Sequence, residues 1–186
     1  MAAPIETKIS DFTGRWSLNR SLSDSLEPCF TLQGVPWIIR KVINFATLEL
    51  QYIKESPSEA TAGPSFAFKQ TVRPGGFDQT NTYNIDGEKR TDTVPIFGEI
   101  TVHCKYLDRS EVKPEQTFGT GIQGDAEKDV AMLEVVESEK MGWRAEALWV
   151  FETVNGENRF CKYNIITKGG QSAKAKLVHD YLGPPN

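Results

Sequence analysis

The chain has 186 residues, of which 39% are hydrophobic and 25% are charged, and its formal net charge is −4. This length and composition suit one globular domain, residues 1–186, in which folding buries roughly 70% of the surface of the unfolded chain. The charges are dispersed without a basic stripe, which excludes a nucleic-acid binder, and no stretch approaches the roughly 20 apolar residues of a membrane-spanning helix.

The three cysteines, Cys29, Cys104 and Cys161, are far apart in the sequence and odd in number. This pattern favours free thiols in a reducing compartment over a disulfide framework or a zinc site. The first ten residues lack the apolar run of a signal peptide. We therefore expect a cytoplasmic protein with flexible ends at residues 1–7 and 183–186. The oligomeric state stays open, with a homodimer as one option.

The first predicted element is a strand over residues 12–19, in which Phe12, Gly14 and Trp16 share one face with a leucine. Residues 21–45 break this period of two. Their apolar residues recur at helical spacing on both sides of Pro36, a residue that is tolerated at the start of a helix. We therefore predict a helix–turn–helix between the first and second strands, lying across one mouth of a barrel.

From residue 47 onward, short runs rich in Val, Ile, Thr, Tyr and Phe alternate with turn residues, as in all-β folds. The predicted strands cover residues 47–54, 65–72, 77–85, 90–97, 99–107, 116–122, 129–137, 142–153, 159–167 and 174–182. Asp86-Gly87 and Asn155-Gly156 predict type I′ hairpins, because these residues tolerate positive φ angles. The sequence thus predicts an all-β, antiparallel up-and-down β-barrel of about ten strands.

Three segments carry a resemblance to a known family. They read Phe12-Thr13-Gly14-Arg15-Trp16, then Leu32-Gln33-Gly34-Val35, then Arg40-Lys41. In this order they resemble the calycin superfamily of lipocalins and related barrels, most closely the intracellular fatty-acid-binding proteins. The last strand of that family carries an Arg-x-Tyr that holds a fatty-acid carboxylate. This chain has no Arg-x-Tyr, so the resemblance does not extend to that clamp.

The whole chain looks similar to the fungal lipocalin-like hetero-Diels–Alderases of tropolonic sesquiterpenoid biosynthesis, through residues 12–16, 32–50 and 178–183. Those enzymes join a tropolone-derived quinone methide to a humulene-type alkene. The resemblance implies a pericyclase of secondary metabolism that binds small lipophilic substrates and uses no cofactor and no metal. The alternative is a non-catalytic intracellular carrier of a fatty acid or another hydrophobic metabolite, which would use the same barrel. A chaperone or partner-binding module is a third class, and it would expose an apolar patch.

Three residues are candidates for a catalytic role: Tyr52, His103 and Lys162. A phenol or an ammonium group inside the barrel could donate a hydrogen bond to a substrate oxygen. Core packing is the alternative for Tyr52, and an exposed position is the alternative for Lys162. His103 shares a strand face with Thr101 and Lys105, so it either faces solvent or belongs to a polar cavity lining.

The candidates for substrate binding are Trp37, Phe68, Gln70, Gln79, Asn81, Tyr83, Trp149 and Asn164. The amides among them interrupt apolar strand faces, and a buried amide without a partner costs about 1–3 kcal/mol. They are therefore expected to contact a ligand or a structural network with ordered water. Gly14 and Trp16 are expected to be structural, with Trp16 plugging the closed end of the barrel and Gly14 allowing close backbone approach.

Overall fold

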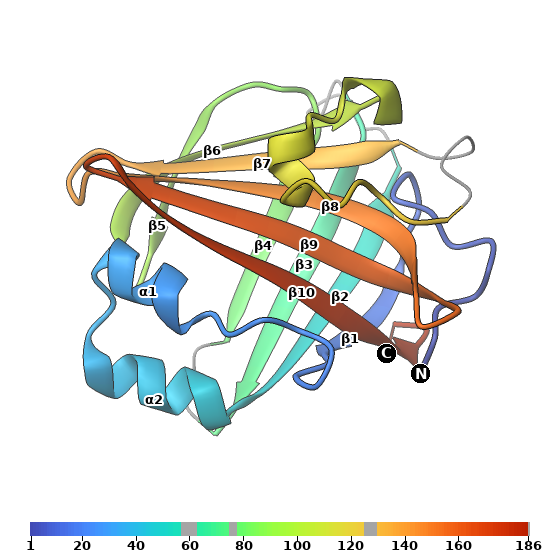
Figure 1. Cartoon of the computed structure of the whole chain (residues 1–186), viewed down its shortest axis with the longest axis horizontal. Coiled ribbons are helices and arrows are strands. Elements are labelled where there is room, and N and C mark those ends of the chain that lie inside the picture. The colour runs from blue at the N-terminus through green and yellow to red at the C-terminus, as the bar shows by residue number, and fades with distance from the viewer. Residues whose placement is uncertain (57–62, 75–77, 125–129, 186) are drawn as a thin grey trace.

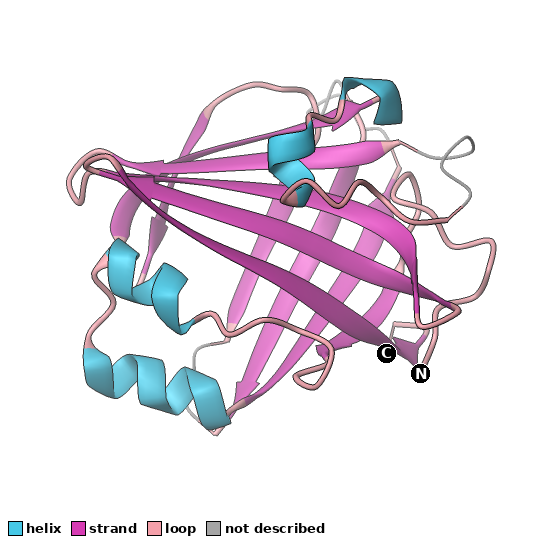
Figure 2. Ribbon diagram, in the orientation of Figure 1, coloured by secondary structure: helices cyan, strands magenta, loops and turns pink. Residues whose placement is uncertain are grey.

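A computed structural model describes residues 1–56, 63–74, 78–124 and 130–185. The strands are β1 (Gly14–Leu18), β2 (Thr47–Glu55), β3 (Ser65–Arg73), β4 (Gln79–Asn84), β5 (Arg90–Val94), β6 (Gly98–Leu107), β7 (Ala131–Ser138), β8 (Trp143–Val154), β9 (Glu157–Lys168) and β10 (Gln171–Gly183). The helices are α1 (Glu27–Gln33) and α2 (Trp37–Phe45), with two short 3₁₀ helices, η1 (Arg109–Glu111) and η2 (Pro114–Thr117). The predicted all-β class and the helix–turn–helix after the first strand are confirmed (Figure 2).

The ten strands form one antiparallel sheet in the order β4-β3-β2-β1-β10-β9-β8-β7-β6-β5. The sheet curls around itself so that β1 pairs with both β2 and β10, which brings the two ends of the chain together (Figure 1). The two edge strands, β4 and β5, are not joined by a ladder among the described residues. The result is the predicted up-and-down barrel, with one unpaired seam in its wall.

The hairpin predicted at Asp86-Gly87 is wrong, because this turn lies at the seam. The N–H of Gly87 donates to the Cys104 carbonyl of β6 at 2.8 Å, and the Asp86 carboxylate accepts two bonds from Arg90 at 2.6 and 2.8 Å. The first bond ties the turn to β6, and no ladder joins β4 to β5 among the described residues. The second predicted hairpin is confirmed, since Asn155 and Gly156 have φ angles of 52° and 80° and connect β8 to β9.

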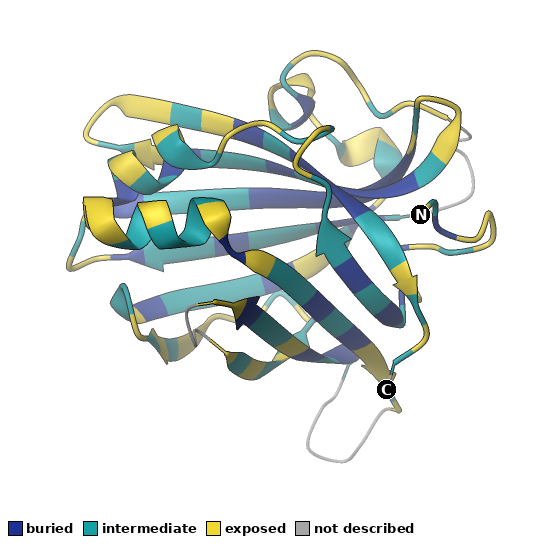
Figure 3. Cartoon of the chain, turned by 90° about the horizontal axis from the view of Figure 1, so that it is seen from below, coloured by how far each residue is buried: buried dark blue, intermediate teal, exposed yellow. Residues whose placement is uncertain are grey.

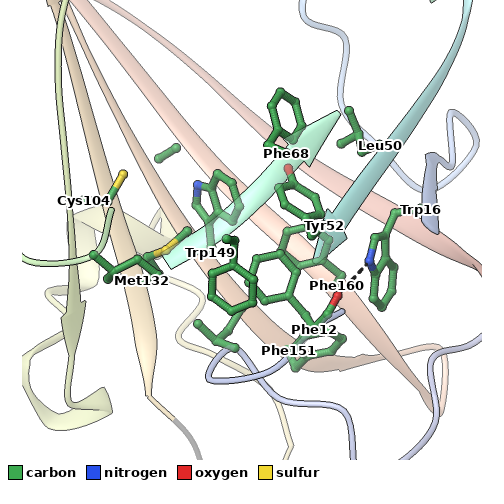
Figure 4. Close-up of a cluster of buried hydrophobic side chains, with 14 of the residues drawn as sticks. Phe12, Trp16, Leu50, Tyr52, Phe68, Cys104, Met132, Trp149, Phe151 and Phe160 are labelled. Atoms are coloured by element: carbon green, nitrogen blue, oxygen red, sulfur yellow. Dashed lines mark hydrogen bonds between the residues drawn. The ribbon is translucent and has the colours of Figure 1, made fainter. Parts of the chain in front are cut away.

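The Phe12–Trp16 motif closes one end of the barrel (Figure 4). Trp16 is fully buried and its Nε1 donates to the Phe12 carbonyl at 3.2 Å. The rings of Phe12 and Trp16 both pack on Phe160, with centroids 5.3 and 5.4 Å away. A Cβ atom at Gly14 would lie 2.6 Å from the Tyr181 ring, so glycine is required there by the aromatic side chain of β10. This end of the barrel is therefore a packed core.

The two helices cover the opposite end to different degrees. Cys29 of α1 is buried with Ile166 and Ala175 in a small apolar cluster on β9 and β10. No residue of α2 is fully buried, and Trp37 and Phe45 are 60% and 84% exposed. Figure 3 shows the exposed outer surface of α2. In the described part of the chain, no helix has the length and apolar character that crossing a membrane requires.

The strand predicted over residues 116–122 is wrong, because this segment forms η2 and a loop on the outer face of the barrel. Phe118 adopts a φ of 57°, and Gly119 and Gly121 also have positive φ angles, which no extended strand allows. The Phe118 ring packs on Tyr163 with centroids 5.3 Å apart. The segment thus covers a second apolar cluster, between the sheet and solvent.

The first residues of the chain lie against β9 and β10. The Ala3 N–H donates to the Asn158 carbonyl at 3.0 Å, and the Asn158 amide donates to the Pro4 carbonyl at 2.9 Å. The terminal amine pairs with Asp180 at 3.1 Å. Near the other end, Arg15 donates to the Pro184 carbonyl at 3.0 Å. The flexibility expected for residues 1–7 and 183–186 stays a prediction.

Candidate functional site

A cavity of about 510 Å³, the mouth cavity, lies between the helices and the strands. Ligand sites commonly have this size and a mainly apolar lining with a few polar groups. The apolar lining consists of Leu18, Leu26, Phe30, Ile43, Ala46, Leu48, Val72, Ile96 and Phe97. Gln70 and Gln79 bring two of the predicted amides to this lining. Arg20, Asp24, Asn44 and two serines complete the lining. The cavity therefore suits a mainly lipophilic molecule that also carries polar groups.

Polar side chains lie deeper in the barrel, below the mouth cavity. Leu48 lines the cavity, and Tyr52 lies four residues further along β2 on the same face. At about 3.3 Å per residue, this spacing places Tyr52 roughly 13 Å deeper. The pairing of Leu48 with Val72 and of Tyr52 with Phe68 repeats the same order on β3.

Lys162 of β9 meets Tyr52 of β2 inside the barrel. Its Nζ donates to the Tyr52 hydroxyl oxygen at 3.0 Å. Tyr52 is fully buried, whereas Lys162 is partly exposed. The Lys162 amine lies over the inward-facing rings of Trp149 and Phe160. The two residues are 110 positions apart in the sequence, and only the curled sheet brings them together.

Glu134 of β7 and Trp149 of β8 complete this cluster. Trp149 Nε1 donates to Glu134 Oε2 at 3.1 Å, and the Tyr83 phenol lies close enough to the Glu134 carboxyl for the two groups to shift each other's pKa. We call Tyr52, Tyr83, Glu134, Trp149 and Lys162 the polar cluster. It combines two phenols, an indole N–H, a carboxyl and an amine in an otherwise apolar interior.

Burial sets the protonation of the polar cluster. It lowers the pKa of Lys162 to about 8, against the attraction of Glu134, and it raises the pKa of Glu134, against the attraction of Lys162. Burial first, and then the negative charge of Glu134, raise the pKa values of Tyr52 and Tyr83 well above the usual range. At pH 7 the phenols are therefore neutral hydrogen-bond donors and Lys162 is mainly an ammonium ion.

The structure brings together five of the residues that the sequence singled out. Tyr52, Tyr83, Trp149 and Lys162 belong to the polar cluster, and Phe68 packs on Tyr52 with ring centroids 5.1 Å apart. The Tyr83 ring lies 5.4 Å from Phe68 and 5.3 Å from Trp149. These aromatic faces form the wall next to the Lys162 amine.

Two other predicted amides are already engaged in bonds within the protein. Asn81 Nδ2 donates to Asp92 Oδ2 at 2.8 Å, across the seam between β4 and β5. Asn164 Nδ2 donates to the carbonyl oxygens of Lys162 and Ala175 at 3.3 Å each. The Asn164 contacts are long, so this amide could exchange them for a ligand at small cost.

The remaining two candidates lie away from the polar cluster. Trp37 is 60% exposed, with the Lys41 amine 5.8 Å from its ring centroid, and it is not part of the mouth-cavity lining. Cys104 takes the inner face of β6, so the adjacent His103 points outward, because successive strand residues alternate. Burial, followed by the charges of Lys89 and Arg144, lowers the pKa of His103.

Sequence reasoning missed Glu134 and Cys104. Glu134 lies between Met132 and Val136 on one face of β7, so a carboxylate on an apolar strand face was the available signal. Cys104 lies directly opposite Glu134 in the ladder between β6 and β7. Nothing in the local sequence of either strand indicates that this face points toward Lys162.

Two curated proteins match nearly the whole chain in sequence, whereas no family model matches it. One is named "Probable pericyclase scpY", from Mollisia scopiformis, with 26% identity over 98% of this chain and 96% of that protein. The other is named "Pericyclase pydY", from an Acremonium species, with 23% identity over 99% of this chain and 98% of that protein. The sequence relatives thus carry the name of a reaction class.

Solved structures show the same fold at low sequence identity. The REP1-NXSQ fatty acid transporter has a TM-score of 0.56 at 15% identity, over 95% of this chain and 99% of that one. The zebrafish ileal bile acid-binding protein, in complex with cholic acid, has a TM-score of 0.54 at 11% identity, over 92% and 98%. The calycin-type barrel that the sequence resemblance implied is therefore confirmed as the fold.

Proposed function

We propose that this chain is a cofactor-independent pericyclase of secondary metabolism. In this proposal it catalyses a hetero-Diels–Alder reaction between a tropolone-type quinone methide and a terpene alkene. The names of the two full-length sequence relatives support the reaction class. The observation that carries the proposal is the Lys162–Tyr52 hydrogen bond, which lies deeper in the barrel than the apolar mouth cavity.

The first contribution to rate is the positioning of two reactants in one enclosed space. A well-oriented pair can save roughly 7–11 kcal/mol of the barrier, because its translational freedom is lost on binding and not in the transition state. The mouth cavity, with its leucine, isoleucine and phenylalanine lining, supplies shape for an alkene. The reaction forms one C–C and one C–O bond from electrons that the reactants already hold, so it needs no redox partner.

The second contribution is polarisation of the heterodiene oxygen by Tyr52. The hydroxyl oxygen of Tyr52 accepts a bond from the Lys162 ammonium, so its own proton can be donated to a ligand carbonyl. Hydrogen bonds in series strengthen one another, and the cation behind the phenol therefore makes it a stronger donor. In a site that excludes water, this donor stabilises the charge that develops on the oxygen.

The test is a cycloaddition with pre-generated reactants. A tropolonic quinone methide is released in buffer with a humulene-type alkene, with and without the protein, and products are resolved by chiral chromatography. The protein should raise the rate and change the diastereomer ratio, and heat-denatured protein serves as the control. Equal rates and equal ratios would sink the proposal.

The second candidate function is a carrier of a fatty acid or another hydrophobic metabolite in the cytoplasm. The Lys162 ammonium inside the barrel favours it, because an ammonium ion can form a charge-assisted hydrogen bond with a carboxylate. Three unpaired, buried thiols suit a reducing compartment. A carrier should bind its ligand tightly and leave the product ratio of the cycloaddition unchanged.

A further inference from the structure

The seam between β4 and β5 is an opening in the wall of the barrel. The two strands have no ladder between them among the described residues, although they follow one another in the chain. A second cavity of about 510 Å³, the seam cavity, lies there. Its lining includes residues 80–84, 90–92 and 102–104. Because neighbouring strand residues point to opposite faces, this lining draws on residues from both the outer and the inner face of the wall.

The seam cavity connects the outer surface with the polar cluster. Thr82 and His103 belong to its outer part, since their side chains point away from the interior. Tyr83 and Cys104 form its inner end, and both lie next to Glu134. A group bound in this cavity would therefore reach the polar cluster from the side and not through the helices.

A smaller cavity of about 190 Å³ links the seam cavity to the mouth cavity. It shares Gln70, Gln79 and Ile96 with the mouth cavity, and it shares Asn81 and Asp92 with the seam cavity. The three cavities thus follow the unpaired strand edges as one track. Asn81 and Asp92, which line both the smaller cavity and the seam cavity, are joined by a hydrogen bond of 2.8 Å.

The chemistry of the lining changes along the track. The mouth cavity is mainly apolar, whereas the seam cavity presents threonine hydroxyls and asparagine amides. Its cation Arg90 is already paired with Asp86, and Asp92 accepts from Asn81. Glu88 adds an exposed carboxylate to this lining. The lining therefore offers hydroxyl, amide and carboxylate groups, which suit a ligand that donates hydrogen bonds and disfavour an anionic one.

We infer that the seam binds the polar, uncharged end of an elongated amphipathic molecule, whose apolar part fills the mouth cavity. The Asn81–Asp92 hydrogen bond opens to admit the polar end, which then reaches Tyr83. The inference rests on the proposed function in one respect, because the seam cavity would extend the mouth cavity in which that function places its reactants. It narrows the ligand class to molecules that are apolar at one end and carry hydroxyl or amide groups at the other.

A reversible bridge across the seam tests this inference. In the variant Asn81→Cys with Asp92→Cys, the two thiols are joined by a short thiol-specific crosslinker that reductant removes, and peptide mapping verifies the bridge. Binding of 1-monodecanoylglycerol is measured by calorimetry, and binding of the compact dye 1-anilinonaphthalene-8-sulfonate by fluorescence. We expect the bridge to lower the affinity for monodecanoylglycerol at least tenfold and the affinity for the dye less than twofold. Reduction of the bridge should restore the affinity for monodecanoylglycerol.

Equal affinity of the bridged and reduced protein for monodecanoylglycerol would overturn the seam inference alone. If the crosslink does not form, Thr91→Trp fills the outer part of the seam cavity, and Thr167→Trp on the exposed face of β9 is the matched control. Thr91→Trp should lower the affinity for monodecanoylglycerol by the same tenfold factor, whereas Thr167→Trp should not. Failure of the reduced protein to bind either probe would contradict an enclosed ligand site altogether. The cycloaddition assay tests the proposed reaction independently of these binding experiments.

Discussion

The amine of Lys162 lies 3.4 Å from the centroid of the Trp149 indole ring. At its edge, the same ring donates through Nε1 to the Glu134 carboxyl at 3.1 Å. One aromatic side chain thus stabilises the cation on its electron-rich face and the carboxyl on its N–H. The barrel can keep an amine and a carboxyl group in an apolar interior without placing them in direct contact, which leaves the Lys162 amine free to bond to Tyr52.

Replacing Lys162 should weaken catalysis more than stability. Lys162→Met removes the charge behind Tyr52 and should lower the cycloaddition rate, by at most the roughly 100-fold that follows the loss of one transition-state donor. Lys162→Arg keeps the positive charge and should retain more of the rate. Single-turnover kinetics measure both variants, with urea unfolding as the control for folding. A Lys162→Met rate within twofold of the parent protein would contradict a catalytic amine.

The pH dependence should have opposite signs for rate and for stability. The ammonium form of Lys162 is lost as the pH rises through about 8, so the cycloaddition rate should fall there. The unfolded chain titrates this lysine near its ordinary value of 10.5. Between these two pH values the unfolded state binds more protons, so the free energy of unfolding contributed by this group should rise. Lys162→Met should lack both trends, as rate profiles and urea titrations at several pH values would show.

Trp16 and Trp37 should differ sharply in their contributions to stability. Trp16 is fully buried at the closed end of the barrel, so Trp16→Ala should lower the free energy of unfolding by about 3–5 kcal/mol. Trp37 is 60% exposed, and Trp37→Ala should change it by no more than about 0.5 kcal/mol. Urea unfolding followed by circular dichroism gives both values. Dye binding by Trp37→Ala also tests the predicted contact between Trp37 and the ligand. A tenfold loss of dye affinity would support a role of Trp37 in ligand binding.

Glu152 should be a structural carboxylate on the outer face of the barrel. Its side chain has no exposure, and it accepts bonds from Lys176 at 2.6 Å and from Tyr163 at 3.0 Å. Glu152→Ala breaks a buried pair and should cost about 3–5 kcal/mol in the free energy of unfolding.

The double variant, Glu152→Gln with Lys176→Met, leaves no uncompensated buried charge, so it should be more stable than Glu152→Ala. Both proteins, once folded, should keep the parent cycloaddition rate, because this cluster lies on the opposite face of the sheet from Tyr52. A large rate loss in the folded double variant would show that the outer cluster positions the inner one. Urea unfolding and the cycloaddition assay together separate the two effects.

Local sequence patterns predicted the features that depend on neighbouring residues. Alternation predicted the strands, helical spacing predicted α1 and α2, and the φ preferences of Asn155 and Gly156 predicted their hairpin. These patterns also singled out Tyr52 and Lys162, because polar groups on apolar strand faces are visible in a linear sequence. These features are local, since side-chain alternation and turn conformation are set within a few residues.

Which residues contact one another across the barrel depends on the tertiary structure. The Asp86-Gly87 turn carries a strong hairpin signal, yet it bonds to β6 and no ladder joins β4 to β5 among the described residues. Likewise, Glu134 and Lys162 share one polar cluster because the closure of the sheet turns both their faces inward. Such contacts join strands that are distant in the sequence, and they depend on how the whole sheet curls. The residues of the polar cluster were therefore partly predictable one by one, but their arrangement was not.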